Sequence, residues 1–475
     1  MDMPLYSASP QVIQTGRPAE IIIRGRLPQT DLRLFDPATL HLKTVGADGL
    51  FSDGQLPGYT CGNHFDLKRP DFENLSDVRP DPETGSLHLT HLFEHEGEYR
   101  IKLCAGDQEL ATFRIYAVRP EWIRLRPFRG DMHLHSGYSG CCGDKLRLSP
   151  EYYAAACCAR GLDFIGIADH KQWQASLRAV DFTEQCGSLF RAYPCEEVHM
   201  KEMHNLHMLN FGGSSGVSKI LHEPDEQYRK EIAACLARTP DKADMLVRLL
   251  MAHHQWVHEK ITERGGLSVL CHPYWRPNDR IFLPTAVLQY ALENNCYDAL
   301  EVYGDPYDRE GLDMAENLHR EYCIRQGRHI PAVGNTDSHG LQHLTINSTV
   351  VFAEKNDLPE LIAAVRSNRI VAVNQYPGEF PRCCGELAWV KYFHFLREHY
   401  YPYHDRRMAK EGELLFSALS SGKPDKAYAE YINRHYFDRK DADNLPAWNR
   451  FQPDTAAFAA IRAEHDRFDK AFFQQ

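Results

Sequence analysis

Two histidines separated by one residue, His133 and His135, form the first group in the chain that could bind a metal ion. In a β-strand, side chains two residues apart point to the same face. The two imidazoles would therefore lie side by side, at a spacing that suits one ion. An H-x-H pair alone is a weak signal, so its weight depends on the residues that follow it.

Further clusters of histidine and acidic residues follow this pair, and several come directly after a short apolar run. They are Ala168-Asp169-His170, Cys195-Glu196-Glu197, His204-Asn205-Leu206-His207, Cys271-His272-Pro273 and Thr336-Asp337-Ser338-His339. Ligands at the carboxyl ends of successive strands are typical of a barrel built from alternating strands and helices. We therefore expect these side chains to meet at one end of such a barrel.

Imidazole and carboxylate donors suit zinc, manganese and iron(II). No C-x-x-C pair is present, and thiolates are not obvious partners, which disfavours a closed structural zinc site. A carboxylate such as Glu197, Asp337 or Asp169 can bridge two ions. Two or three ions sharing a hydroxide would lower its pKa and hold a phosphoryl or carbonyl group during attack. Each ligating histidine also needs an acceptor that orients its ring, and we expect Asp131 to fill that role.

Strands alternating with helices would position these residues. Short apolar runs at 163–168, 267–271, 299–303 and 330–335 predict buried strands. Ser149-Pro150 predicts the start of one helix, which Gly161 would end. Thr239-Pro240 predicts the start of a second helix, which Gly265-Gly266 would end. Repeated strand-helix units over this length favour a parallel sheet closed into a barrel.

The two ends of the chain have a different character. Residues 1–125 show short alternating runs between Gly, Pro and Asp turns, which predicts an immunoglobulin-like β-sandwich. Residues 126–378 would form the metal-binding barrel. Residues 379–475 are rich in Tyr, Phe, His and charge, and predict a helical extension with helices at 389–400 and 423–434. This extension could cap the barrel or join copies of the chain into a homo-oligomer.

Composition narrows the function. The chain has 475 residues and a formal net charge of −11, without a long basic run, which disfavours a nucleic-acid partner. We find no apolar run long enough to span a bilayer and no N-terminal signal segment. The 14 cysteines then predict reduced thiols. We therefore expect a cytoplasmic protein with a small-molecule substrate and no membrane partner.

Taken in order, the motifs resemble the PHP (polymerase and histidinol phosphatase) superfamily over about residues 129–375. They are H-x-H, a strand ending in D-H, P-x-x-E, H-x-L, C-H-P and T-D-S-H. The resemblance implies a distorted (β/α)7 TIM-like barrel with two or three divalent ions, which would be Zn, Mn or Fe. It implies His133, His135, Glu197 and Asp337 as ligands of one ion; Glu197, His207 and His272 as ligands of a second, with Glu197 as the bridge; and His170 and His339 as ligands of a third.

Two positions leave alternatives open. Family members usually supply another ligand five or six residues after H-x-H, where this chain has Gly140 and Cys141. Asp144 could replace it after a short insertion, and Cys141 or Cys142 is the alternative. The second ambiguity is Glu196 against Glu197, and the register set by Pro194 favours Glu197.

The residues after His272 could recognise a substrate. Arg276 could bind phosphate or carboxylate oxygens, and Trp275 could stack on a sugar or base, although a packed loop is an equal alternative. Tyr303 ends a predicted strand and could line the same pocket. The Gly/Ser-rich segment 212–225 could form a lid.

These observations predict a metal-dependent hydrolase, and the family resemblance favours a phosphoesterase. The catalytic residues would be His133, His135, Glu197, His272 and Asp337. Two alternatives stay open. One is an amidohydrolase-like enzyme that cleaves amides, lactones or cyclic esters. The other is a binding module in which the barrel is structural.

Overall fold

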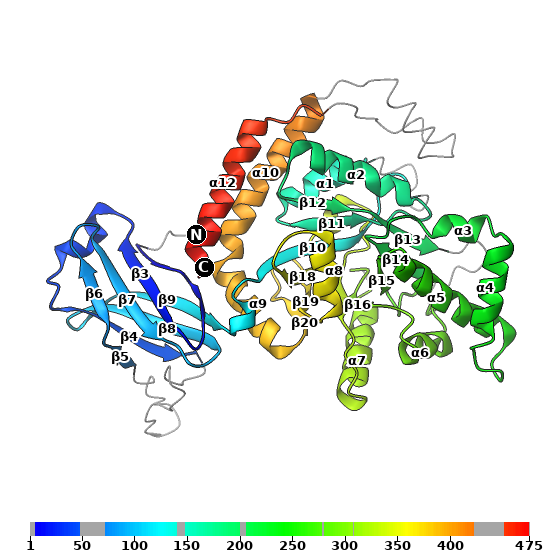
Figure 1. Cartoon of the computed structure of the whole chain (residues 1–475), viewed down its shortest axis with the longest axis horizontal. Coiled ribbons are helices and arrows are strands. Elements are labelled where there is room, and N and C mark those ends of the chain that lie inside the picture. Colours follow the sequence, from blue (N-terminus) through cyan, green and yellow to red (C-terminus); the bar gives the residue numbers. More distant parts are fainter. Residues whose placement is uncertain are drawn as a thin grey trace. The chain divides into compact units, whose positions relative to one another are not determined.

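The computed structural model describes residues 5–47, 72–139, 148–199, 206–277, 280–306, 308–421 and 451–474 (Figure 1). The chain divides into two compact units. Unit 1 comprises Met1–Leu125, Lys391–Tyr403 and Ala463–Gln475, and unit 2 comprises Arg126–Val390 and His404–Arg462. The C-terminal residues, for which the sequence predicts a separate helical extension, are thus divided between the two units.

Unit 1 contains two sheets that share one core. The first has the order β1 (Tyr6–Ser9), β3 (Pro18–Gly25), β7 (Ser86–Leu92) and β6 (Val78–Asp81); the second has the order β2 (Val12–Gln14), β9 (Gln108–Val118), β8 (Gly97–Ala105), β4 (Leu40–Gly46) and β5 (Glu73–Leu75). In β3 the alternation puts Ile21 and Ile23 in the core, while Glu20 and Arg24 are exposed. Apolar residues of both sheets pack into one cluster, so the two sheets form a β-sandwich.

The far end of the chain contributes to unit 1 as well. The isolated bridge between Val12 and Phe473 extends the pairing at β2, and the backbone N–H of Gln11 donates to the carbonyl of Phe472 at 2.8 Å. The helices of the C-terminal part are α9 (Leu387–His399), α10 (Tyr401–Ser421) and α12 (Thr455–Phe472). The first of them confirms the helix predicted at 389–400. The helix predicted at 423–434 lies outside the described residues.

The strands of unit 2 pair into two sheets. One has the order β12 (Arg191–Tyr193), β11 (Phe164–Ile167), β10 (Arg126–Leu134), β18 (Asn347–Ala353), β19 (Ile370–Asn374) and β20 (Arg382–Gly385); the other has the order β13 (Cys195–His199), β14 (His207–Phe211), β15 (Leu267–Leu270), β16 (Ala299–Tyr303) and β17 (Ala332–Gly334). Two isolated parallel bridges, Leu134 to Ser338 and His170 to Glu197, connect the sheets. Unit 2 is therefore a mixed α/β structure.

Strand pairing does not close a barrel among the described residues of unit 2. We expected parallel pairs throughout, yet β13–β14, β14–β15, β10–β18, β18–β19 and β19–β20 are antiparallel. Only residues 200–206 separate β13 from β14. A parallel crossover needs about a dozen residues or more, so this short connection permits only a hairpin.

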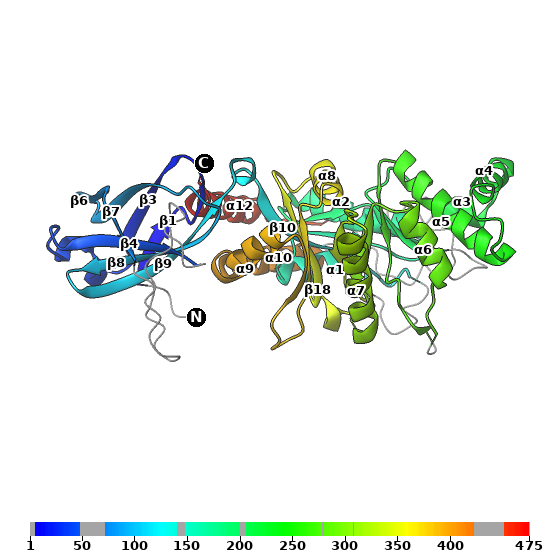
Figure 2. The same ribbon diagram turned by 90° about the horizontal axis from the view of Figure 1, so that it is seen from below.

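Helices surround these sheets: α1 (Pro150–Ala159), α2 (Trp173–Cys186), α3 (Ser218–His222), α4 (Glu226–Leu236), α5 (Met245–Glu263), α6 (Thr285–Glu293), α7 (Arg309–Arg325) and α8 (Leu358–Arg366). In both views α5 lies between α4 and α6 (Figures 1 and 2). Short 3-10 turns occur at Pro28–Thr30, Leu32–Leu34, Pro120–Trp122 and Leu341–His343. Among the described residues, no helix has both the length and the apolar character needed to cross a membrane.

Of the two predicted helix starts, one is confirmed and the other is wrong. The Ser149 hydroxyl accepts the N–H of Tyr152 and Pro150 is the first residue of α1, as predicted. The predicted start at Thr239-Pro240 is wrong, because α5 begins at Met245 with the Asp244 carboxylate as its cap. The Thr239 hydroxyl instead donates to the carbonyl of Leu236 at the end of α4. The predicted end of α5 is confirmed, since the helix stops at Glu263, two residues before Gly265 with φ 74°.

Candidate metal centre

The end of β10 brings His133 and His135 to one buried spot, because His133 lies in the strand and His135 directly follows its last residue, Leu134. Both side chains are fully buried, and their ring centroids are 5.2 Å apart. The Nε2 atoms of His133 and His135 lie 3.3 and 2.9 Å from Oδ1 of Asp337, which follows β17. Both Nε2 atoms lie 3.5 Å from Oε2 of Glu197 in β13. Four donor atoms from three segments, at the ends of β10 and β17 and in β13, therefore surround one point.

The Glu197 carboxylate faces further histidines with each of its oxygens. Oε1 lies 2.8 Å from Nδ1 of His207 and 3.3 Å from Nε2 of His272. Oε2, which faces the β10 pair, also lies 2.8 Å from Nδ1 of His170. A carboxylate that contacts two sets of imidazoles through different oxygens has the geometry of a bridge between two ions.

Donor atoms in unit 2 gather into three tight groups, in each of which every donor lies within 4.8 Å of the others. The groups are His133 with His135 and Asp337; His135 with His170 and His339; and His133 with Glu197, Cys271 and His272. His339 is the most exposed of these ligand candidates, with 41% of its side chain accessible. All of the described residues that the sequence predicts as metal ligands are thus brought into one cluster.

The donor set fits divalent cations. Four of its buried atoms, His133 Nε2, His135 Nε2, Glu197 Oε2 and Asp337 Oδ1, have no hydrogen-bond partner. The two imidazole nitrogens lie 2.9–3.5 Å from the two carboxylate oxygens, without hydrogen-bond geometry. Buried polar atoms are nearly always satisfied. Donors around one tetrahedral ion with bonds of about 2.1 Å would lie about 3.4 Å apart, which matches this spacing.

Charges in the cluster keep its carboxylates ionised. Burial alone would raise the pKa of Glu197 and of Asp337. The surrounding imidazoles outweigh burial and hold the pKa of both carboxyls well below the usual range, chiefly His207 at Glu197 and His133 at Asp337. Metals bind the ionised form of a carboxylate, so both side chains are in the state that binds cations.

The two β10 histidines differ in their protonation. Burial alone would lower the pKa of His133, but the charges of Asp337, Glu301 and Glu197 outweigh it and raise this pKa well above its ordinary value. At His135, burial and then the nearby His339 lower the pKa to about 4. His135 is therefore neutral near pH 7, the form in which an imidazole binds a metal.

Glu301 in β16 orients the ligands, a role that we predicted for Asp131. Oε1 of Glu301 lies 3.1 Å from Nδ1 of His133, and Oε2 accepts the backbone N–H of His272 at 2.8 Å. Asn335 donates from its amide to Oε1 at 2.8 Å. The carboxylate of Asp131 instead accepts the backbone N–H groups of His133 and Thr336 and the Thr336 hydroxyl. Asp131 therefore positions backbone, and the prediction that it orients a ring is wrong.

Asp169 holds Ser136, the residue that follows His135. Its carboxylate accepts the N–H of Ser136 at 2.6 Å and the Ser136 hydroxyl at 2.5 Å. This contact holds the turn that follows His135. The Ser139 hydroxyl in the same turn lies 3.2 Å from Nδ1 of His135 and is a candidate acceptor for its ring.

The structure separates the two neighbouring glutamates Glu196 and Glu197. Consecutive residues of a strand point to opposite faces, and only Glu197 faces the histidines. Glu196 accepts the side-chain amide of Asn210 at 3.1 Å and the backbone N–H of Val217. It thereby anchors segment 212–225, which we expected to be a lid and which contains the short helix α3.

The predicted substrate-binding residues have different surroundings. Trp275 packs against the rings of His207 and His272, with centroids 5.8 and 5.4 Å away. The Arg276 guanidinium forms ion pairs with Asp308 at 2.9 Å and Glu310 at 2.7 Å. Of these two residues, only Trp275 contacts the rings of proposed ligands.

We expected Tyr303 to line the pocket, but its side chain makes other contacts. Its hydroxyl donates to Glu316 of α7 at 3.0 Å, and its ring belongs to the apolar cluster that α6 and α7 form with the sheet. The pairing of β16 with β17 shifts register between Glu301 and Tyr303. This irregularity breaks the period of two that would have put both side chains on one face.

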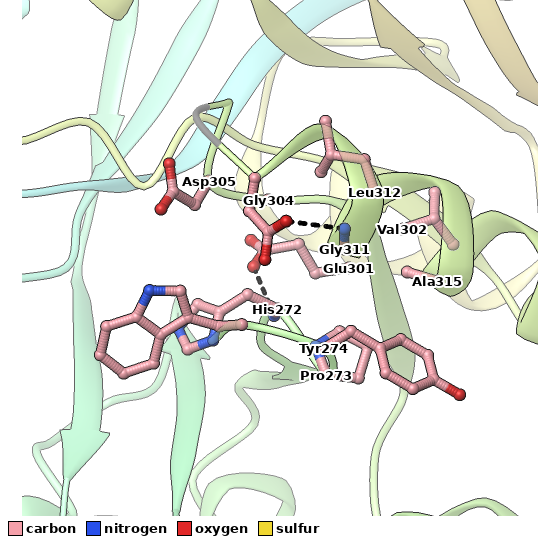
Figure 3. Close-up of a pocket in the computed structure, with 12 residues that line it drawn as sticks. His272, Pro273, Tyr274, Glu301, Val302, Gly304, Asp305, Gly311, Leu312 and Ala315 are labelled. Carbon is pink, nitrogen blue, oxygen red and sulfur yellow. Dashed lines mark hydrogen bonds between the residues drawn. The ribbon is translucent and has the colours of Figure 1, made fainter. Parts of the chain in front are cut away.

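A small pocket lies beside the contact between Glu301 and His272 (Figure 3). Its lining includes Trp275, Gly304 and Asp308 together with His272 and Glu301. A Cβ on Gly304 would come within 2.9 Å of the Glu301 carboxylate and 3.0 Å of the His272 Cβ. Glycine at this position therefore keeps the space between the two side chains open.

Three residues near the cluster were not predicted as part of it. Neither Glu301 nor Cys271 was expected to contact the ligands. His199 lies directly opposite His207 in the β13–β14 pair, with ring centroids 4.6 Å apart. Its position two residues after Glu197 is the signal that could have revealed it. Asp144, Cys141, Cys142 and His204 lie outside the described residues.

Comparisons with known proteins give neighbours by structure only. No protein-family model and no curated protein matches the chain. Solved structures that it resembles include a two-domain protein from Bacteroides vulgatus that contains a predicted PHP-like metal-dependent phosphoesterase (TM-score 0.37, 15% identity, covering 53% of this chain and 66% of that one). Others are an amidohydrolase from Chromobacterium violaceum (TM-score 0.31, 15%, 51% and 96%) and a lesion-specific endonuclease from Pyrococcus furiosus (TM-score 0.31, 16%, 51% and 56%).

The first of these neighbours carries the same PHP description that the sequence motifs predict. The chain spans just under two thirds of its length. Because the TM-scores are low, the function proposed below rests on the residues of the site itself.

Proposed function

We propose that unit 2 is a metal-dependent hydrolase that cleaves a phosphate ester of a small molecule. The observation that carries this proposal is the convergence of buried donor atoms without hydrogen-bond partners on the Glu197 and Asp337 carboxylates. Such a cluster is costly to bury without a cation, because two carboxylates lose their hydration. A purely structural unit would have no chemical need for this set of ligands.

The proposed ligand sets are those that the family resemblance implies, and the tight groups agree with them in part. His133, His135, Glu197 and Asp337 would hold one ion, and Glu197, His207 and His272 a second. His170 and His339, which form a group with His135, would hold a third, with Asp144 as a further ligand. When bound, two or three zinc, manganese or iron ions would supply positive charge that activates water and stabilises the charge developing on phosphate oxygens.

The side chains of the chain have separate tasks in this proposal. Glu197 ties the two sets of histidines together through its two oxygens. Glu301 fixes the ring of His133 and the backbone of His272. Trp275 forms an apolar wall beside His207 and His272, against which a substrate could pack. Arg276 and Tyr303 have no place in the proposal, because other side chains of unit 2 already engage them.

We also propose that the two sheets of unit 2 are the halves of a distorted barrel. The bridges Leu134 to Ser338 and His170 to Glu197 join them at residues adjacent to or within the ligand cluster. The domain division at about residues 125 and 378 stays a proposal of the same kind. Cytoplasmic location and a small-molecule substrate without nucleic acid follow from composition alone, with net charge −11 as their support.

Two substitutions test the proposed ligands. We expect His272→Ala and Asp337→Asn each to lower hydrolysis of p-nitrophenyl phosphate by about a hundredfold or more, because each removes a ligand from the cluster. Turnover, bound metal by elemental analysis and circular dichroism would be measured on the full chain. His343→Ala, outside the three donor groups, is the control and should keep its activity. Near-normal turnover in either ligand variant would contradict the assignment.

A substrate panel tests the reaction class. The chain would be assayed with added Mn²⁺ or Zn²⁺ on a phosphomonoester, a phosphodiester, a lactone and a short oligonucleotide. Turnover of a small phosphate ester supports the proposal. Turnover of the lactone alone would favour the amidohydrolase-like alternative, and cleavage of the oligonucleotide alone would contradict the small-molecule substrate. A purified chain without stoichiometric metal or turnover would overturn the enzyme proposal.

A further inference from the structure

A buried thiol borders the ligand cluster of unit 2. Cys271 directly follows β15 and is 3% exposed. It belongs to the tight group in which one donor atom each of His133, Glu197, Cys271 and His272 lie within 4.8 Å of one another. Donors of one tetrahedral ion are about 3.5 Å apart, so the Cys271 sulfur lies near the distance at which it could share an ion with Glu197 and His272.

The surroundings of this thiol suit a ligand. His133 Nε2 and Glu197 Oε2 in the same group are fully buried without a hydrogen-bond partner. The Cys271 thiol makes a weak sulfur contact with the carbonyl of Val269 at 3.5 Å. A divalent cation beside the sulfur would displace the thiol proton, because a coordinating thiol is deprotonated.

We propose that Cys271 is a thiolate ligand of the ion assigned to Glu197, His207 and His272, on the side of that ion that faces His133. On binding, the Sγ–H bond breaks, its proton passes to solvent, and the sulfur lone pair forms the bond to the ion. Thiolate ligands favour zinc and iron(II) over manganese, so this residue sets the metal preference of the site. The inference rests on the proposed function, because this ion is one of those assigned to the hydrolase.

Other buried thiols allow a matched control. Cys195 in β13 is fully buried, and its thiol contacts the carbonyl of Met132 at 3.5 Å. It belongs to none of the three donor groups. Cys195→Ala therefore removes a buried thiol of the same core cluster as Cys271 without removing a proposed ligand.

Cobalt(II) spectroscopy of the full chain tests the proposal. The metal-free protein would be titrated with Co²⁺ alone, and the near-ultraviolet charge-transfer band of a cobalt–thiolate bond recorded. We expect the band in the wild type and in Cys195→Ala, and its loss in Cys271→Ala and Cys271→Ser. We also expect the affinity ratio of Zn²⁺ over Mn²⁺ to fall about tenfold or more in both Cys271 variants. Circular dichroism and bound cobalt per chain would show that they fold and still bind metal.

The outcomes separate this inference from the proposed function. A wild-type chain that binds cobalt and hydrolyses its substrate without a thiolate band would overturn the role of Cys271 alone. Persistence of the band in both Cys271 variants would assign it to another cysteine and also overturn the inference. Failure to bind any metal would overturn the proposed function, and this inference with it.

Discussion

Glu301 affects two proposed ligands at once. One oxygen lies against the His133 ring and the other accepts the N–H of the residue that carries the second imidazole, His272. A carboxylate behind an imidazole fixes the ring orientation and raises its basicity. The sequence places Glu301 at the end of a strand, but its partner depends on how β16 sits relative to β10. The spacing of residues along the chain does not show which residue Glu301 will contact.

We expect Glu301→Gln to weaken metal binding by about 10- to 100-fold. The amide keeps the size of the carboxylate but loses the charge that supports His133, and one of its two positions becomes a donor facing a backbone N–H. Metal dissociation constants by competition with a chelator would measure the effect, and the melting temperature of the metal-free protein would exclude a folding defect. Glu310→Gln, on an exposed carboxylate, is the control. Unchanged metal affinity in Glu301→Gln would contradict the orienting role.

At the scale of elements, local patterns predicted some of the strands of unit 2 and the paired histidines. The period of two correctly brought His133 in β10 and His135, directly after it, to the same side, and the apolar runs marked β11, β15 and β16. The patterns failed where structure depends on partners. The antiparallel hairpin β13–β14 and the register shift at Tyr303 are both set by pairing between strands. Both Thr239 and Asp244 can cap a helix, so the start of α5 was ambiguous from sequence.

One buried histidine ties helix α10 to strand β11. Nε2 of His404 lies 2.8 Å from Oδ1 of Asp163, which precedes β11, and Nδ1 lies 3.0 Å from the Asp405 carboxylate. Asp405 in turn pairs with Arg129 of β10 at 2.6 Å. Burial alone would lower the pKa of His404, but Asp163 and then Asp405 raise it to about 9. The imidazolium is therefore part of the folded structure at neutral pH.

The interaction of the His404 imidazolium with Asp163 and Asp405 makes the stability of unit 2 depend on pH. Because the folded pKa is higher than the unfolded value of about 6.5, the contribution is fully present below about pH 6.5 and is lost as the pH rises through about 9. We expect the free energy of unfolding to fall by about 2 kcal/mol between pH 6.5 and 8.5. Urea unfolding across this range would measure it. His404→Gln should lack the decline and the exposed control His95→Gln should keep it; equal slopes in all three proteins would refute the assignment.

At the scale of the whole molecule, every proposed ligand comes from unit 2, whereas unit 1 contributes none. The sequence predicted the sandwich character of the first 125 residues, because period-two alternation is local. It could not predict that residues 391–403 and 463–475 join that unit. Helices such as α9 and α12 show an amphipathic pattern, but this pattern does not reveal which other surface of the protein the apolar face packs against.

Metal removal should therefore change the two units unequally. Ions that bind only the folded site stabilise it, and a chelator withdraws that stabilisation. We expect a chelator to speed amide hydrogen exchange about tenfold or more in residues 131–135, 195–199 and 336–339. The strands β3, β7 and β8 of unit 1 serve as an internal control and should be unaffected. Hydrogen exchange with mass spectrometry would measure this. Equal acceleration in both units, or none in either, would contradict metal binding at the cluster.

The joining of residues 11–14 to residues 472–474 has a consequence for how the protein is made. Val12 accepts the N–H of Gln474 at 2.8 Å, and Gln14 donates its N–H to the Gln474 side chain at 2.8 Å. During synthesis, β2 leaves the ribosome hundreds of residues before these partners exist. The edge of the sheet at β2 therefore stays without these partners until residues 472–474 have been synthesised, and an open sheet edge can pair with other chains. A delay before residues 472–474 pair with β2 would thus expose nascent chains to aggregation. A chaperone that covers this edge during the delay would protect the yield of folded protein.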